Sequence, residues 1–191
     1  MAAGFDILGE NRVQEAEAKA AAIAGACWHL IGPLQSNKAR RAVELFDAIE
    51  SVDSVDLARR LDRLAGELGR APFGVYLQVN VDRDPAKAGF LPEALEAELA
   101  VLGGLSNLRR LGLMTVGRLT GSAREKRMTF VRLRELSERL RGGETAASGG
   151  GGAPSAGLGA GLSMGMTADY PIAVEEGATV IRVGRAIFGA R

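Results

Sequence analysis

Two glycine-containing turns near the end of the sequence combine residue types that bind anions. The stretch SMGMTADY places the hydroxyls of Ser163 and Thr167 around Gly165, whose amide is free of Cβ crowding. The stretch RVGRAIFG places Gly184 and Arg185 at the start of a predicted short helix. Hydroxyls, a guanidinium and the free amides of a helix N-terminus all hold phosphate. Each turn alone is explained as well by a tight loop, but the two together predict a phosphate site.

Arg182 lies inside a short apolar run, two residues before Gly184. A guanidinium in a buried parallel strand needs a partner, because burial of an unpaired charge is costly. One interpretation is an ion pair with a carboxylate of a neighbouring strand, such as Glu10 or Asp53. The other is that Arg182 donates to a ligand. The sequence leaves both open.

The remaining polar candidates carry weaker signals. His29 is the only histidine and lies between apolar residues, which favours a hydrogen-bonded core histidine over a metal ligand or a catalytic base. Asn11 and Asn80 lie near the ends of predicted strands, where either could cap a turn. Lys38 and Lys87 are predicted to be solvated loop residues. The sequence has no Walker loop, no GxGxxG and no GxSxG motif, and we predict no metal site.

These candidates lie where short apolar runs end. Seven such runs alternate with helical patterns, at residues 5–9, 27–31, 47–51, 73–81, 108–116, 161–166 and 178–184. Alternation with short connections predicts parallel strands joined by crossover helices, and continuous apolar runs predict strands covered on both faces. Seven strands fit a doubly wound sheet. They also fit a (β/α)8 barrel that lacks its first βα unit, with MAAG as the tail of the missing helix.

The helical patterns have recognisable ends. Asp53 is the predicted N-cap of a helix with an apolar stripe, and Pro92 suits the first turn of the next. A long amphipathic helix is predicted over residues 123–141. It is followed by a Gly/Ala/Ser-rich segment, residues 142–161, which we interpret as a surface loop. We expect residues 1–191 to form a single domain.

Composition excludes several classes of protein. The 191 residues are 47% hydrophobic and 25% charged, as in globular proteins, and the net charge of +1 gives no sign of a nucleic-acid or membrane partner. One cysteine rules out an internal disulfide framework. No apolar run approaches the roughly 20 residues that span a bilayer. The N-terminus does not resemble a signal peptide, so we expect a cytoplasmic location.

Five stretches in order resemble the YggS/PROSC family of pyridoxal phosphate homeostasis proteins. They are GENRVQE, WHLIGPLQSNKARR, VNVDRDPAKAG, GLMTVG and LSMGMTADYPIAVEEGATVIRVGRAIFGAR. The resemblance implies a (β/α)8 barrel of the alanine racemase N-terminal type that binds pyridoxal 5′-phosphate (PLP). Members are regarded as non-catalytic proteins that buffer or deliver the cofactor. It therefore implies a monomer whose partners are PLP and PLP-dependent apo-enzymes.

The resemblance also implies roles for particular residues. Arg182 would face the pyridine nitrogen, where an arginine keeps that nitrogen unprotonated and weakens the ring as an electron sink. Asn11 would lie near the ring, and His29 and Met114 would line the mouth of the barrel. The phosphate would be surrounded by Ser163, Gly165, Thr167, Gly184 and Arg185.

Two departures from the family pattern affect these expectations. Position 185 is arginine where the family commonly has threonine. The family's Schiff-base lysine, in a segment resembling AVSK, has no counterpart, so we predict no catalytic residue. We expect either an N-terminally truncated sequence or a protein that holds PLP without a covalent bond. The alternatives are a PLP-dependent amino-acid racemase-like enzyme and a degenerate barrel that binds no cofactor.

Overall fold

The chain forms one parallel β-sheet flanked by helices in a computed structural model, which describes residues 4, 6–118, 120–147 and 157–189. The strands are β1 (Ile7–Glu10), β2 (Cys27–Leu30), β3 (Ala48–Val52), β4 (Phe73–Gln78), β5 (Leu108–Met114), β6 (Gly161–Met166) and β7 (Val180–Arg182). The helices are α1 (Val13–Ala20), the 3-10 turn η1 (Ser36–Lys38), α2 (Ala39–Leu45), α3 (Val55–Glu67), α4 (Pro92–Gly103), α5 (Ala123–Ala147), α6 (Tyr170–Glu175) and α7 (Arg185–Phe188).

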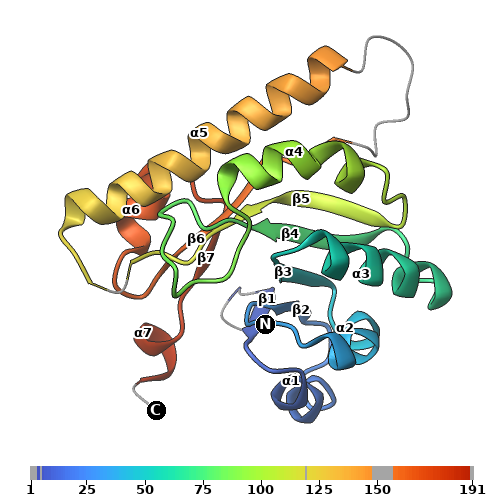
Figure 1. Cartoon of the computed structure of the whole chain (residues 1–191). Helices are drawn as coiled ribbons and strands as arrows, with labels where there is room; N and C mark the ends of the chain where they lie inside the picture. The colour runs from blue at the N-terminus through green and yellow to red at the C-terminus, as the bar shows by residue number, and fades with distance from the viewer. Residues whose placement is uncertain (1–3, 5, 119, 148–156, 190–191) are drawn as a thin grey trace.

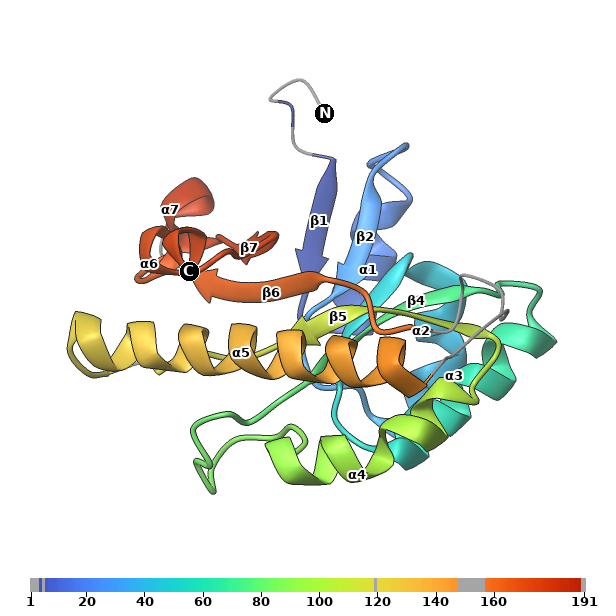
Figure 2. The ribbon, with the colours of Figure 1, turned by 90° about the horizontal axis from the view of Figure 1, so that it is seen from above.

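The sheet keeps the order of the sequence, from β1 to β7, and every pair of neighbouring strands is parallel. A doubly wound sheet would reverse direction at a switch point, so that alternative is wrong. The sheet is also strongly curved. Glu50 on β3 and Ser163 on β6 are separated by two intervening strands, yet their side chains are hydrogen-bonded. Opposite walls therefore face one another, as in a nearly closed α/β barrel (Figure 2).

Helices α2 to α5 pack their apolar sides against the outside of the sheet (Figure 1). On α3 the predicted stripe is confirmed, because Leu57, Leu61 and Leu64 are buried in the core. The predicted cap of this helix is one residue off. The N-cap is Ser54, whose Oγ accepts a hydrogen bond from the Leu57 amide, and not Asp53.

Two of the predicted loops differ from expectation. Helix α5 continues through Gly142 to Ala147, so only part of the segment 142–161 is loop; residues 148–156 lie outside the described residues, and Gly161 already belongs to β6. Lys87 is also not a solvated lysine. Its Nζ donates to the carbonyl oxygens of Val116 and Gly117, 3.2 and 3.1 Å away, which ties the loop after β4 to the end of β5.

The loop after β4 is organised by Asn80. Its side-chain amide donates to the carbonyl oxygens of Asp84 and Lys87, and its Oδ1 accepts from the Asp84 amide. The prediction that this residue caps a turn is confirmed. Within the described ranges, no helix is both long and apolar enough to cross a membrane, and no three acidic, histidine or cysteine side chains cluster as metal ligands would.

Candidate functional site

A buried polar network crosses the interior of the barrel at the carboxyl ends of the strands. Its centre is Glu50 on β3, whose side chain is 1% exposed. Oε1 of Glu50 lies 2.7 Å from His29 Nδ1 on β2, and Oε2 lies 2.5 Å from Ser163 Oγ on β6. Arg182 on β7 donates from Nη1 to the same Ser163 oxygen, at 2.5 Å. Four strands thus contribute to one hydrogen-bonded chain.

Arg182 is held on two sides. Besides the bond to Ser163, its Nη2 donates to the Thr115 carbonyl oxygen at 2.7 Å, and Nη1 lies 3.9 Å from Glu50 Oε2. The expected ion pair with Glu10 or Asp53 is therefore wrong, since the facing carboxylate is Glu50. Burial lowers the pKa of the Arg182 guanidinium below its ordinary value, while the negative charges of Glu50 and Asp169 oppose that shift.

Glu10, the first of those two expected partners, forms an ion pair with Lys19 of α1 at the other end of the sheet. Its partner therefore belongs to its own βα unit and not to β7. The error has a simple physical origin. Both expected carboxylates stand at strand ends, whereas Glu50 stands inside an apolar run and its position across the barrel depends on how the sheet curves.

The structure places two further candidates in the interior. His29 is buried and hydrogen-bonded, which confirms the interpretation of a partnered core histidine. Met114 ends β5, is fully buried and pairs in register with Ser163. His29 is therefore a member of the network, and Met114 lies next to it.

The first predicted phosphate turn follows β6. Gly165 has a φ of +90°, and a Cβ at this position would lie 2.5 Å from the Cβ of Ala173, so glycine is required for α6 to pack on β6. The start of α6 already holds an acidic side chain, the buried Asp169, which accepts a hydrogen bond from the Met166 amide. The half-buried Thr167 has a hydroxyl with no partner among the described residues.

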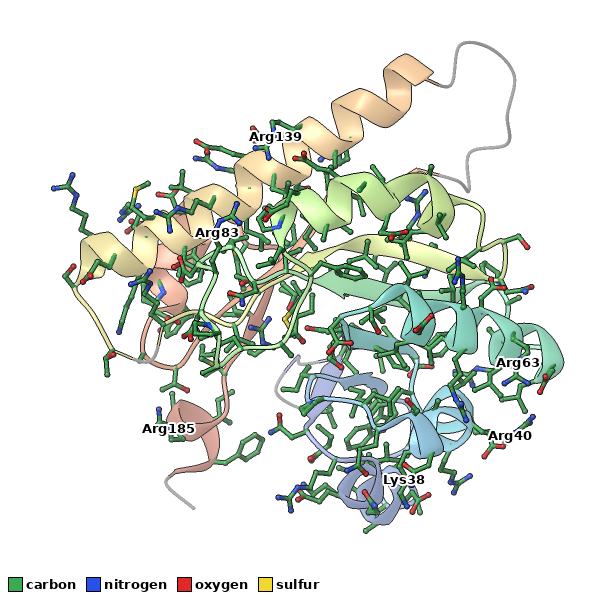
Figure 3. All side chains as sticks on the ribbon, viewed as in Figure 1. Lys38, Arg40, Arg63, Arg83, Arg139 and Arg185 are labelled. Carbon is green, nitrogen blue, oxygen red and sulfur yellow. The ribbon has the colours of Figure 1, made fainter. Side chains whose placement is uncertain are left out.

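The second predicted turn follows β7. Gly184 has a φ of −118°, and a Cβ there would meet nothing within 4 Å, so neither the backbone nor packing requires glycine. The space above this backbone is open to a ligand. Arg185 begins α7, is exposed, and its guanidinium has no partner within the described part of the chain. Figure 3 shows its side chain on α7, near the C-terminus and apart from the sheet.

Within the described part of the chain, Asn11 makes no hydrogen bond to this network. It is exposed at the tip of β1 and lines an open hollow of about 880 Å³ between the loops that follow β1 and β2. The opposite side of this hollow is formed by Pro33, Leu34, Gln35 and Lys38. The two loops touch at Gly32, where a Cβ would lie only 2.3 Å from the Asn11 carbonyl oxygen.

The structure thus joins Arg182, Ser163 and His29 through a residue that the sequence analysis did not single out, Glu50. The sequence did contain an indication that Glu50 is a buried polar residue with a partner. A charged residue inside a strand covered on both faces requires a buried partner, which is the argument that identified Arg182. Applied to the run DAIES, the same argument would have selected Glu50 as well.

The amino-acid sequence matches known proteins over nearly its whole length. The model of the alanine racemase N-terminal domain family matches residues 1–191. The pyridoxal phosphate homeostasis protein of Synechocystis sp. is 40% identical, with 99% of this chain and 83% of that protein covered. Its counterpart in Pseudomonas aeruginosa is 41% identical, with 100% of this chain and 76% of that protein covered. The chain belongs to the pyridoxal phosphate homeostasis protein family.

Solved structures agree with this membership of the pyridoxal phosphate homeostasis protein family. PipY of Synechococcus elongatus has been solved with PLP bound and without it; the two structures give TM-scores of 0.85 and 0.86. In both comparisons the identity is 48%, with 98% of this chain and 84% of PipY covered. Alanine racemase of Clostridium difficile, in complex with cycloserine, is 16% identical with a TM-score of 0.70, covering 97% of this chain and 48% of the racemase. That similarity concerns the fold alone.

Proposed function

We propose that this chain binds PLP at the carboxyl ends of its strands and takes part in PLP homeostasis without turning over a substrate. The observation that carries the proposal is the fixed guanidinium of Arg182 in the barrel interior. Its Nη1 and Nη2 bonds orient it, and its Nε–H has no partner among the described residues. A hydrogen-bond donor is therefore left for an acceptor such as a pyridine nitrogen.

The residues present fit such a ligand, with one adjustment to the expected roles. Ser163 Oγ donates its proton to Glu50 and accepts from Arg182, so as it stands it has no proton left to donate to a phosphate. The unpartnered Thr167 hydroxyl and the open backbone at Gly184 are better placed to hold that group. Glycine at position 184 is otherwise unexplained, and a ligand close to the backbone gives it a reason.

The residues around the proposed site are expected to hold PLP without activating it for catalysis. Bound PLP supplies an aldehyde and a ring that can withdraw electrons, and an arginine beside the ring nitrogen weakens that withdrawal. Arg182 donates a hydrogen bond to the nitrogen and does not offer a readily released proton, because a guanidinium stays protonated at neutral pH. This favours holding the cofactor over transforming an amino acid.

The finer parts of the proposal concern partners and place of action. The protein would act as a monomer in the cytoplasm and pass PLP to PLP-dependent apo-enzymes. The names of the two curated relatives given above, both pyridoxal phosphate homeostasis proteins, support a non-catalytic role.

The test is an equilibrium titration of the purified chain with PLP and with pyridoxal, which lacks the phosphate. We expect saturable binding of PLP and at least tenfold weaker binding of pyridoxal. Arg182→Gln should weaken PLP binding, whereas Arg40→Gln, which removes an exposed arginine paired with Glu67, should not. Absence of PLP binding by the unmodified chain would favour a degenerate barrel. Conversion of L-alanine to D-alanine would favour the racemase-like alternative.

A further inference from the structure

Glu50 is the one member of the buried network that touches or faces all the others. Its carboxylate lies against His29 Nδ1 and Ser163 Oγ, and Arg182 Nη1 is 3.9 Å away. It also raises the pKa of the Tyr76 hydroxyl on β4, together with the burial of that residue, which is the larger cause. The side chain is almost completely buried. Glu50 thus links His29, Ser163 and Arg182, which come from three different strands.

The direction of each proton in the network follows from the donors available. Arg182 can only donate, so Ser163 Oγ must accept from it. The Ser163 proton is then directed to Glu50 Oε2, and an ionised carboxylate is the partner that accepts it. The second carboxylate oxygen accepts from His29 Nδ1–H, so in the neutral imidazole it is Nε2 that carries no proton. The carboxylate thus determines which nitrogen of His29 carries the proton.

Structural stabilisation alone explains this arrangement poorly. A buried ion pair commonly contributes no more to stability than well-packed apolar residues of the same volume, because removing the charges from water is costly. Here a carboxylate, an imidazole, a hydroxyl and a guanidinium are all buried in one layer. Such a layer is explained better if its role is to orient hydrogen-bond donors toward a ligand. The direction that is fixed is that of Arg182, through Ser163 on one side and Thr115 on the other.

We propose that Glu50 is the positioning residue of the cofactor site, directing Arg182 toward the ring nitrogen of PLP through Ser163 and fixing His29 as its Nδ1–H form. This rests on the proposed function as far as PLP is concerned. The part that concerns His29 holds for the chain with no ligand. Glu50 makes no contact with the ligand in this scheme, so its effect on binding passes entirely through Arg182.

The first experiment compares two ligands on two variants. One ligand is PLP, and the other is its carbocyclic analogue, in which C–H replaces the ring nitrogen. In Glu50→Gln, Ser163 and Arg182 lose their charged partner, and we expect the dissociation constant for PLP to rise about tenfold, as for loss of a hydrogen bond to a charged group. The constant for the analogue should change less than threefold. The matched control is Glu176→Gln, which removes the charge of a buried glutamate that caps the C-terminus of α6 and pairs with Arg127 and Arg134.

The second experiment needs no ligand. His29 is the only histidine, so a nitrogen-15 NMR spectrum of the untagged chain contains one pair of imidazole signals. We expect Nδ1 to carry a proton in the unmodified chain, and Nε2 to carry none while the imidazole is neutral. This pattern should change in Glu50→Gln and persist in Glu176→Gln.

Particular results would overturn the proposal. Equal loss of affinity for PLP and its analogue in Glu50→Gln would show a general structural effect, as would an unchanged His29 spectrum. If the unmodified chain binds neither compound, the proposed function fails and the role toward the ring nitrogen fails with it; the His29 spectrum then decides the remaining part alone. If the unmodified chain binds both and Glu50→Gln leaves both affinities unchanged, only the role of Glu50 is wrong.

Discussion

Asp82 provides a sharp test of how the loop after β4 is held against α5. Its side chain is only 4% exposed and accepts three hydrogen bonds, from Thr129 Oγ1 at 2.6 Å, Arg132 Nη1 at 2.9 Å and Arg118 Nε at 3.0 Å. The perturbation is Asp82→Asn, which keeps the size of the side chain. It removes the charge and replaces one acceptor oxygen by an NH2 group that faces donors.

The expected loss in the free energy of unfolding can be worked out from these contacts. A hydrogen bond to a buried charged group contributes about 1.5 kcal/mol. The two arginines are 39% and 47% exposed, so solvent screens their ion pairs with Asp82 and we assign these pairs only a small further contribution. Because asparagine keeps one oxygen for one donor, we expect a loss of about 2 kcal/mol at neutral pH. For a chain of this length, this corresponds to a fall of roughly 4–8 °C in the melting temperature.

The dependence on pH gives the assay its second readout. Burial alone would raise the pKa of Asp82, but the hydrogen bonds from Thr129 and Arg118 and the charges of both arginines outweigh it, and the pKa is lowered. Because the pKa of Asp82 is lower in the folded than in the unfolded chain, its ionised form stabilises the fold. This stabilisation is complete at pH values above the pKa that Asp82 has in the unfolded chain. That stabilisation is lost as the pH falls through the pKa of the folded state.

The assay is urea unfolding of the unmodified chain and of Asp82→Asn at several pH values. At pH 7 the variant should have the lower free energy of unfolding, and the difference between the two free energies should become smaller toward acid pH. Asp56→Asn is the control, because that carboxylate is 97% exposed and its loss should cost less than about 1 kcal/mol. A difference that stays constant between pH 7 and the acid limit would refute the reasoning. So would an Asp82→Asn variant as stable as the unmodified chain.

Three further substitutions test the packing around the site. Gly32→Ala would place a Cβ 2.3 Å from the Asn11 carbonyl oxygen, so we expect a lower melting temperature and altered backbone amide NMR signals at Asn11. Ser54→Ala removes the cap bond to the Leu57 amide and should cost about 1 kcal/mol by urea unfolding. Phe130→Ala empties a fully buried position on α5 and should cost about 3–5 kcal/mol in the same assay.

The sequence was sufficient to predict the elements of this fold. All seven strands lie within or overlap the predicted apolar runs, because strands covered on both faces are apolar along their whole length. Pro92 begins α4 as expected, since proline lacks the N–H that the first turn leaves unused. The errors in the predicted elements lie at helix and strand ends. For example, α3 is capped by Ser54 and not by Asp53, because both types of side chain cap helices well and the two residues are adjacent.

Contacts across the barrel could not be predicted in the same way. Arg182 was recognised as needing a partner, but the choice among carboxylates depends on which strands face one another. Glu50 and Ser163 are 113 residues apart, and they meet only because the sheet curves. Lys87 shows the same limitation, because its carbonyl partners at Val116 and Gly117 belong to the following βα unit. The local sequence pattern can show that a buried charged residue needs a partner, but only the tertiary structure shows which residue that partner is.

The most direct measurement of the central claim is a crystal structure of the chain grown with PLP. We expect the pyridine nitrogen within hydrogen-bonding distance of the Arg182 guanidinium and the phosphate beside Thr167 and Gly184. PLP bound instead in the hollow between Asn11 and Lys38, with no contact to Arg182, would contradict the proposed site.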